Sequence, residues 1–189
     1  MLLDLIRANR SYRRFYEEAA IGRPVLESLI NLARLCPSGA NRQALNYYLA
    51  DDEAINEKVF ATLGWAGYLP EWPGPAAGER PSAYIVIVQE LAYKQAVGID
   101  HGIAAQSILL GAAELGLGGC MLGNIRRPEL CQALSIPETE EVLLVIALGK
   151  PKETVVIDEI DPGDDIKYWR DENQVHHVPK RKLQDVIKN

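Results

Sequence analysis

The strongest hydrophobic pattern in the chain covers residues 103–115, which are apolar on nearly every helical face. A helix without a polar side cannot face water, so this pattern predicts a helix buried in the core. Asp100 is placed to cap its start and Gly116 to end it. A glycine-rich turn then leads into the apolar residues 120–122, which predict a strand that ends at Gly123. We expect a ligand to contact the backbone at this strand end, because glycine leaves the chain accessible there.

Apolar residues at helical or strand spacing predict most of the other elements. Helices are expected at residues 2–8, 24–35, 54–63 and 128–134, with Pro24 at the first position of its helix, where the missing N–H is not needed. Strands are expected at residues 46–50, 83–89 and 142–148, which are rich in β-branched and apolar side chains. Residues 36–43 predict a loop because they are rich in turn-forming residues.

Residues 64–81 lack this periodicity and carry Trp65, Tyr68 and Trp72 among prolines and glycines. A long irregular stretch inside a compact domain is typically a functional lid or disordered, and the aromatic residues argue against disorder. We therefore expect these three side chains to stack on a substrate. Packing in the interior explains aromatic residues equally well and stays open as an alternative.

The last part of the chain, residues 158–189, differs in character from the rest. An acidic, turn-forming stretch is followed by Tyr168, Trp169 and Arg170 and then by the basic sequence HHVPKRK at residues 176–182. Such a tail cannot cover a hydrophobic core of its own. We expect it to be either a solvated extension or an arm that wraps around a partner, such as a second copy of the chain.

Composition and charge limit the class of protein. The 189 residues, 48% hydrophobic and 24% charged, predict one globular domain. A net charge of −6 argues against general nucleic-acid binding. No stretch approaches the roughly 20 apolar residues that span a membrane, and the first apolar run is short and contains Asp4, so we expect a cytoplasmic protein. Cys36, Cys120 and Cys131 have neither metal nor redox spacing and are expected to be reduced thiols.

The glycine-rich turn at residues 116–119 does not match the known nucleotide fingerprints. It follows a helix and opens a strand, whereas a dinucleotide fingerprint follows a strand and opens a helix. Gly118 and Gly123 have the spacing of a phosphate-binding P-loop, but Asn124 stands where that motif needs lysine. Two interpretations remain from the residues alone: a helix cap followed by a tight turn, or a turn that contacts a ligand.

Two basic clusters are candidate phosphate sites. Arg10, Ser11 and Arg13 place two guanidinium groups and a hydroxyl within four residues, and arginine binds phosphate through paired, charge-assisted hydrogen bonds. Lys180 and Lys182 form a second and weaker candidate. A solvated basic surface explains either cluster without a ligand.

The sequence provides no metal site and no nucleophile. His176 and His177 are adjacent, so their side chains point apart on a strand, and no acidic or cysteine partner lies at ligand spacing. Serine and cysteine motifs typical of hydrolases are missing from the sequence. If the protein is an enzyme, we expect a cofactor to carry the chemistry.

Four motifs occur in the order and spacing of the nitroreductase family of FMN-dependent oxidoreductases. They are RSYRRF at residues 10–15, PSGANRQ at 37–43, ELGLGGCMLG at 114–123 and HHVPKRK at 176–182. The chain resembles this family over nearly its whole length. It departs from the family at Ala44 and Leu45, where family members usually have Pro-Trp.

The resemblance implies a fold and a set of binding residues. The fold would be a three-layer α+β domain with a mostly antiparallel sheet flanked by helices, assembled as an intertwined homodimer whose C-terminal extension, residues 158–189, embraces the partner. FMN would lie at the dimer interface. The resemblance assigns these residues to FMN: Arg10, Ser11 and Arg13; Ser38, Gly39 and Asn41 from the partner subunit; the backbone of Leu122 and Gly123 near flavin N5; and Lys180 and Lys182 at the phosphate.

The implied activity is hydride transfer from NADH or NADPH to an electron-poor acceptor such as a nitroarene, a quinone or an activated alkene, by a ping-pong mechanism. The flavin performs the redox chemistry, and Arg13 is the candidate for stabilising its reduced form. The alternatives are a flavin carrier, sensor or flavin-processing protein without reductase turnover, and an interaction protein without a cofactor.

Overall fold

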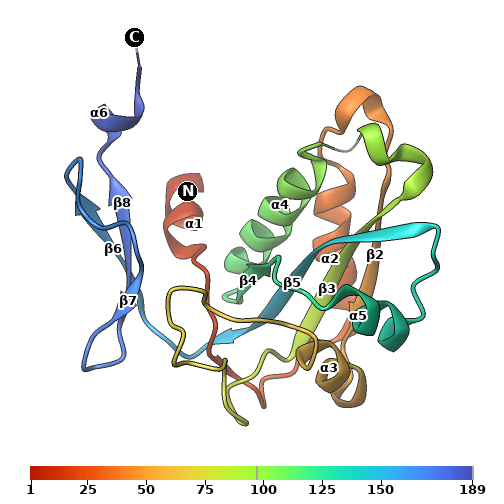
Figure 1. The fold of residues 1–189 in the computed structure, drawn as a ribbon, viewed down its shortest axis with the longest axis horizontal. Helices are drawn as coiled ribbons and strands as arrows, with labels where there is room; N and C mark the ends of the chain where they lie inside the picture. Colours follow the sequence, from red (N-terminus) through yellow and green to blue (C-terminus); the bar gives the residue numbers. More distant parts are fainter. Residues whose placement is uncertain (97, 189) are drawn as a thin grey trace.

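The helices and strands of the chain are seen in a computed structural model that describes residues 1–96 and 98–188 (Figure 1). The α-helices are α1 (Leu2–Ala8), α2 (Arg23–Arg34), α3 (Glu53–Phe60), α4 (Asp100–Glu114), α5 (Arg127–Leu134) and α6 (Leu183–Val186). The strands are β1 (Phe15–Tyr16), β2 (Leu45–Ala50), β3 (Ala83–Glu90), β4 (Gly118–Leu122), β5 (Glu140–Pro151), β6 (Val155–Ile160), β7 (Trp169–Arg170) and β8 (His176–Arg181). Each helix and strand expected from the sequence is present, with ends that differ by a few residues.

The central sheet has the order β1-β5-β3-β2, and β4 also pairs with β5. Every pair in this sheet is antiparallel. Its longest strand, β5, contains the apolar run 142–148 and lies at the centre, since fully apolar strands must be covered on both faces. The expected antiparallel α+β sheet is therefore confirmed.

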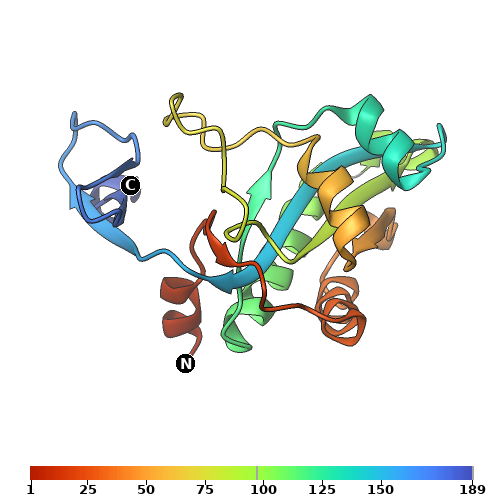
Figure 2. The same cartoon turned by 90° about the horizontal axis from the view of Figure 1, so that it is seen from below.

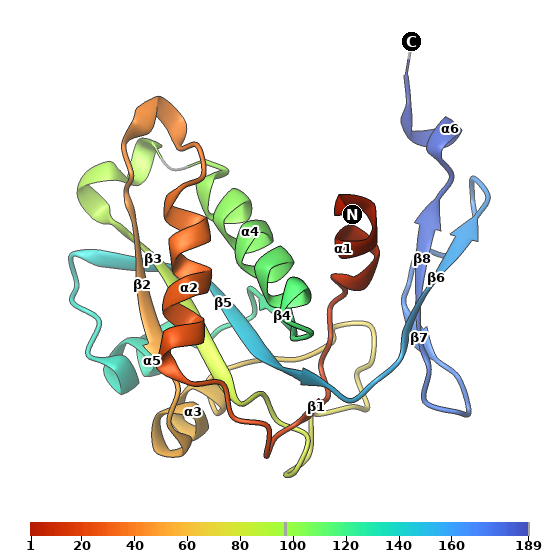
Figure 3. The same cartoon turned by 180° about the vertical axis from the view of Figure 1, so that it is seen from behind.

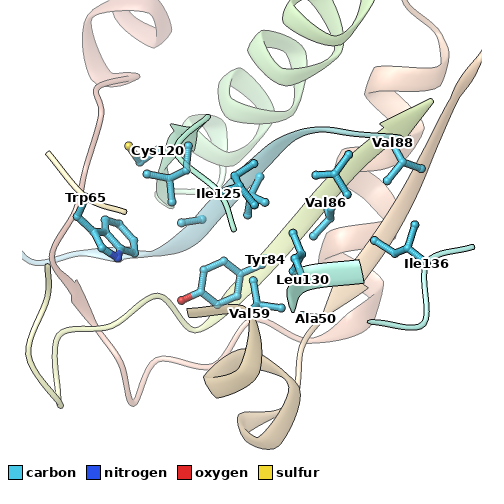
Figure 4. Close-up of a cluster of buried hydrophobic side chains, with 14 of the residues drawn as sticks. Ala50, Val59, Trp65, Tyr84, Val86, Val88, Cys120, Ile125, Leu130 and Ile136 are labelled. Atoms are coloured by element: carbon cyan, nitrogen blue, oxygen red, sulfur yellow. The ribbon is translucent and has the colours of Figure 1, made fainter. Parts of the chain in front are cut away.

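Helices cover both faces of the sheet, which gives three layers (Figures 1 and 3). Along β3, Tyr84 and Val86 pack with α3 and α5 in the cluster shown in Figure 4. The alternate residues Ile85 and Ile87 pack with α2 and α4, which lie side by side (Figure 3). This alternation follows from the two-residue period of a strand. The sheet is apolar on both sides because each side meets a pair of helices.

The central helix α4 agrees with its prediction at one end and differs at the other. Gly116 ends the helix with a φ of 71°, and Leu117 N–H donates to Ala112 O at 2.9 Å, as in a Schellman motif. The prediction that Asp100 caps the start is wrong, because the N-cap residue is Ile99. The Asp100 carboxylate instead accepts from the backbone N–H of Gly39, at 3.1 and 3.0 Å to its two oxygens. The Asp100 carboxylate therefore binds a residue that is distant in sequence and does not cap its own helix.

The all-apolar pattern of α4 predicted burial on every side, and a single chain buries only part of the helix. Ala105, Ile108 and Ala112 face the core, whereas Ile103 and Leu110 on the other side are half-buried. An additional layer over this side would complete the burial.

Helix α3 ends before the expected residue 63. Ala61–Leu63 form a turn in which the Thr62 hydroxyl donates to Val59 O at 2.7 Å, and Leu63 pairs with Ile125 beyond β4. Tertiary pairing has therefore replaced the last helical turn.

The C-terminal segment forms a sheet of its own, in the order β6-β8-β7. β6 runs parallel to β8, and β7 runs antiparallel to it. Figure 2 shows this sheet standing beside the main body, with α1 and the N-terminal segment on the side that faces it. Residues 158–189, called the C-terminal arm from here on, thus contain regular strands. Among the described residues, no helix is both long and apolar enough to cross a membrane.

Candidate functional site

The segment that carries Ser11 lies alongside β4. Ser11 forms a parallel bridge with Gly119, and Tyr12 N–H donates to Gly119 O at 3.0 Å. A Cβ at Gly119 would lie 2.5 Å from Ala147 O on β5 and 2.6 Å from Leu109 on α4. The glycine at this position therefore permits three elements to meet. The glycine-rich residues therefore end α4 and also pair with the segment that carries the basic cluster. The sequence alone did not show this second contact.

Two arginines of this segment have unused hydrogen-bonding groups. Arg10 Nη2 donates to Ile6 O at 2.7 Å, and Arg13 Nη1 donates to Ser11 O at 3.3 Å. The Nε atom of each side chain is buried and has no hydrogen-bond partner in the described part of the chain. Buried donors in native proteins nearly always have partners, so these residues fit an anionic group such as a phosphate or the polar edge of a planar ring.

Arg13 also contacts the C-terminal arm. Its Nη1 lies 3.3 Å from His176 Nε2, and its guanidinium carbon lies 4.9 Å from the centre of the Tyr168 ring. The backbone N–H of Arg13 donates to the carboxylate of Glu153, which also accepts from Arg170 Nη2 at 3.1 Å. Three residues, His176, Tyr168 and Glu153, thus contact Arg13, and Arg170 pairs with one of them.

Burial controls the ionisation of this cluster. Burial, together with the positive charges of the neighbouring Arg13 and Arg170, lowers the pKa of His176 to about 4, so the imidazole is neutral at pH 7. Burial also lowers the pKa of Arg170, partly opposed by Glu153, although an arginine stays charged. Burial raises the pKa of the Cys120 thiol, which keeps it protonated beside the positive charge of Arg13. The neutral imidazole of His176 therefore lies among the charged side chains of Arg13, Arg170 and Glu153.

The other end of β4 carries Leu122 and Gly123. Leu122 is buried, whereas a Cβ at Gly123 would meet no atom within 4 Å. A backbone hydrogen bond of 2.9 Å from Gly64 N–H to Asn124 O holds the chain just beyond this end. Since a strand rises about 3.3 Å per residue, Gly123 lies roughly 13 Å along β4 from Gly119. The open backbone and the basic cluster thus mark two ends of one elongated edge.

Ser38, Gly39 and Asn41 do not join this edge in a single chain. Gly39 is bound to Asp100 at the start of α4, whereas Ser11 pairs just beyond the end of that helix. A helix of 15 residues is about 22 Å long, so the two sets are separated by that length. Asn41 has a φ of 52°, in the left-handed region that asparagine tolerates, and the Ser38 hydroxyl accepts from Gln43 N–H at 3.0 Å. The loop is therefore well defined but distant from the basic cluster.

The two lysines lie on or just after β8. Lys182 Nζ forms an ion pair with Asp161 at 2.6 Å, and this contact raises its pKa. Lys180 is exposed and lies opposite Glu159 in the register of β6 and β8. One acidic residue therefore pairs with Lys182, and another lies beside Lys180 on the neighbouring strand.

The three aromatic residues of segment 64–81 have different environments. Trp65 is only 9% exposed and packs in the core, where Gly74, with a φ of 117°, lies against its indole ring. Trp65 is thus packed in the interior of this chain. Tyr68 is 49% exposed, and its ring centre lies 5.0 Å from that of Tyr168, with the two ring planes tilted by 51°. The Arg170 guanidinium lies over the Trp72 ring, 4.3 Å from its centre. These two face the C-terminal arm.

Sequence and structure comparisons give the family. A model described as "Nitroreductase family" matches residues 6–150. A protein of Archaeoglobus fulgidus named "Putative NADH dehydrogenase/NAD(P)H nitroreductase" is 30% identical over 160 residues, which cover 80% of this chain and 86% of the relative. The chain belongs to the nitroreductase family.

Solved structures of other nitroreductase-family proteins share the fold. The protein from Streptococcus pneumoniae TIGR4 aligns over 100% of both chains with a TM-score of 0.71 and 12% identity. The NADPH:FMN oxidoreductase of Vibrio harveyi, solved in complex with NAD+, has a TM-score of 0.63 and 21% identity, over 80% of this chain and 69% of its own. At these identities the likeness establishes the fold alone.

In this nitroreductase-family chain, the adjacent residues His176 and His177 have different neighbours: His176 lies beside Arg13, and His177 lies beside acidic residues. His177 Nδ1 lies 2.8 Å from Asp158, and its Nε2 lies 3.7 Å from Asp171, so carboxylates that the sequence did not reveal flank the ring. They sit at opposite ring nitrogens and do not converge on a common point. In the described part of the chain, no group of three or more histidine, cysteine or acidic residues could hold a metal ion.

Sequence reasoning missed the contacts that Glu153, Tyr168, Arg170 and His176 make around Arg13. Arg13 and His176 are 163 residues apart in the chain, so no local spacing could reveal their contact. The available signal was the presence of Tyr168, Trp169 and Arg170 in a tail without a core. That signal indicated a packed surface but not its partner.

Proposed function

We propose that this chain is an FMN-dependent oxidoreductase that passes hydride from NADH or NADPH to an electron-poor small molecule by a ping-pong mechanism. The observation that supports this most directly is the pair of buried, unpartnered Nε groups of Arg10 and Arg13 beside Ser11, on an edge that ends at the open backbone of Gly123. When bound, FMN supplies the ring that accepts and donates hydride. The acceptor class is a nitroarene, a quinone or an activated alkene.

The residues of the edge have separate roles in this proposal. Arg10 and Ser11 bind the phosphate, where a guanidinium and a hydroxyl can both donate. Arg13 places a permanent positive charge near the pyrimidine edge of the ring, and such a charge stabilises the negative charge that reduction brings. The backbone N–H groups of Leu122 and Gly123 are proposed to face the ring near N5. No side-chain acid or base is needed for this chemistry.

A homodimer would complete the site. Ser38, Gly39 and Asn41 are a helix length away from Ser11 in one chain, so we propose that the partner subunit supplies them. Leu2 and Leu3 of α1 are 66% and 55% exposed, and the half-buried side of α4 is apolar, which supports a covered surface here. In this arrangement the arm of residues 158–189 reaches the partner. Lys180 and Lys182 then leave their acidic neighbours, Glu159 and Asp161, and bind the FMN phosphate instead.

The remaining proposals concern the substrate and the compartment. Tyr68 and Trp72 are the residues of segment 64–81 that could contact a substrate, since Trp65 is in the core. A cytoplasmic location agrees with three free cysteines, Cys36, Cys120 and Cys131.

An absorbance spectrum of the purified protein tests the proposed function. A flavin spectrum that bleaches when NADH or NADPH is added without oxygen supports a reductase. A flavin spectrum that stays oxidised favours a carrier or sensor, and a colourless protein that does not take up FMN contradicts both. Light scattering tests the dimer, and a dimer that survives truncation from Asp164 would contradict the embrace by the arm.

A further inference from the structure

The orientation of the Arg13 guanidinium is set by only one of its nitrogens. Nη1 donates to Ser11 O and lies at the same distance, 3.3 Å, from His176 Nε2. Nε has no hydrogen-bond partner in the described part of the chain, and no hydrogen bond from Nη2 to a nitrogen or oxygen atom is found there, although the Cys120 thiol also lies beside the guanidinium. In a guanidinium, the N–H bonds of Nε and Nη2 are parallel and form a fork for a two-atom acceptor. The contacts of Nη1 therefore orient the guanidinium and leave the Nε–Nη2 fork available to a ligand.

His176 is suited to act as the acceptor in this contact. It is 1% exposed, its backbone N–H donates to Thr154 O at 2.9 Å, and β8 holds it in register with Val155. Its ring lies 5.2 Å from that of Tyr168, which also underlies Arg13. Arginine has no acceptor, so Nε2 must accept, and we assign the ring proton to Nδ1.

The charge balance of the cluster explains why a neutral acceptor matters. Glu153 is paired with Arg170, so these two buried charges offset each other. A carboxylate at position 176 would likewise offset Arg13. Because His176 is neutral, it orients the guanidinium and leaves its positive charge available. The four residues Arg13, Glu153, Arg170 and His176 thus carry a net charge of about +1, which suits an anionic ligand.

We infer that His176, with the Tyr168 ring, is a positioning residue that aims the free Nε–Nη2 fork of Arg13 at the bound flavin. The C-terminal arm is then part of the machinery that sets the affinity and reduction potential of the cofactor, in addition to any role in assembly. This inference rests on the proposed function, because it requires that Arg13 contacts FMN.

The test measures FMN dissociation constants and flavin midpoint potentials of the full-length chain. His176→Phe removes the acceptor and keeps a ring, and it should weaken FMN binding roughly tenfold, the effect of a lost hydrogen bond to a charged group. If the reduced form loses tenfold more affinity than the oxidised form, the two-electron potential falls by about 30 mV. His176→Asn keeps an acceptor and should recover most of the affinity. In an Arg13→Ala background, His176→Phe should have no further effect.

His177→Phe is the matched control. His177 is the next residue, stacks on Trp169 at 4.1 Å and binds Asp158, so the change disturbs the same strand without touching Arg13. Its FMN affinity and potential should equal those of the wild type. Thermal unfolding of each FMN-free variant shows whether the fold is kept.

Four outcomes would overturn the inference: wild-type affinity and potential in His176→Phe, an equal loss in His177→Phe, no recovery in a folded His176→Asn, or a full effect of His176→Phe without Arg13. A wild-type chain that never binds FMN would contradict the proposed function itself. A wild type that binds FMN while His176→Phe is unchanged would contradict this inference alone.

Discussion

The guanidinium of Arg170 donates to the carboxylate of Glu153 at 3.1 Å, and the Glu153 side chain is 0% exposed. Glu153 follows the end of β5 in the main body, whereas Arg170 lies on β7 of the C-terminal sheet. The Arg170 guanidinium also lies over the Trp72 ring, 4.3 Å from its centre. One buried ion pair therefore joins the two sheets of the molecule.

Removing Arg170 should strongly destabilise the fold. Arg170→Ala leaves the Glu153 carboxylate buried without its cationic partner, which typically costs about 3–5 kcal/mol. Urea unfolding followed by circular dichroism measures this loss. The comparison is Lys167→Ala, whose side chain is 63% exposed and lies 3.8 Å from Asp165; its effect should stay within about 0.5 kcal/mol. Equal stability of the two variants would show that the pair does not hold the sheets together.

Stability should fall in mild acid because of His176. Its pKa is about 4 in the folded chain, below the ordinary value of 6.5, so the unfolded chain binds the proton more tightly. The stability contribution is complete above pH 6.5 and is lost as the pH falls towards 4, by an amount on the order of 3 kcal/mol. Unfolding free energies between pH 7 and 4 should show this slope, and His176→Asn should flatten it. Glu79, whose pKa Arg14 lowers to about 2, acts in a separate window between pH 4.5 and 2.

Adding a methyl group at Gly119 should destabilise the fold and displace the basic segment. A Cβ there would lie 2.5 Å from Ala147 O, which is backbone and cannot move freely, so Gly119→Ala should cost roughly 1–3 kcal/mol. It should also weaken FMN binding, because Gly119 pairs with Ser11. Gly102→Ala in α4 is the control, since a Cβ there meets nothing within 4 Å, and it should be neutral or stabilising. A fully stable Gly119→Ala variant with normal FMN affinity would show that β4 and β5 are not packed this closely at Gly119 and Ala147.

Truncating Trp65 should affect stability, and truncating Tyr68 should not. Trp65 is in the core with Phe60 at 5.7 Å, so Trp65→Ala should cost about 3–5 kcal/mol. Tyr68 is half-exposed, and Tyr68→Ala should change stability by less than about 1 kcal/mol while altering the KM for an acceptor if it contacts substrate. Chemical unfolding and steady-state kinetics separate the two effects. The reverse result would restore Trp65 as a surface lid residue.

The sequence by itself determined the elements, and its resemblance to a family implied the fold class. The apolar runs of β3 and β5 are typical of strands that are covered on both faces, and the spacing of apolar residues in α2 and the all-apolar α4 predicted helices to cover them. Four motifs spread over the chain indicated the family, and Gly116 correctly marked the end of α4. These features are local or periodic, so the order of residues is enough to read them.

Only the tertiary structure decided which polar groups meet. Asp100 binds Gly39 and does not cap its own helix, Trp65 enters the core, and Arg13 meets His176 from the far end of the chain. A short polar or aromatic side chain has several local options of similar free energy, and the contact it finally makes depends on which distant segment is packed beside it. The glycine-rich residues 116–119 lead into β4, and distant packing likewise places Ser11 and β5 beside this strand. Periodicity sets where the chain is buried, and packing between distant segments sets the chemistry of the site.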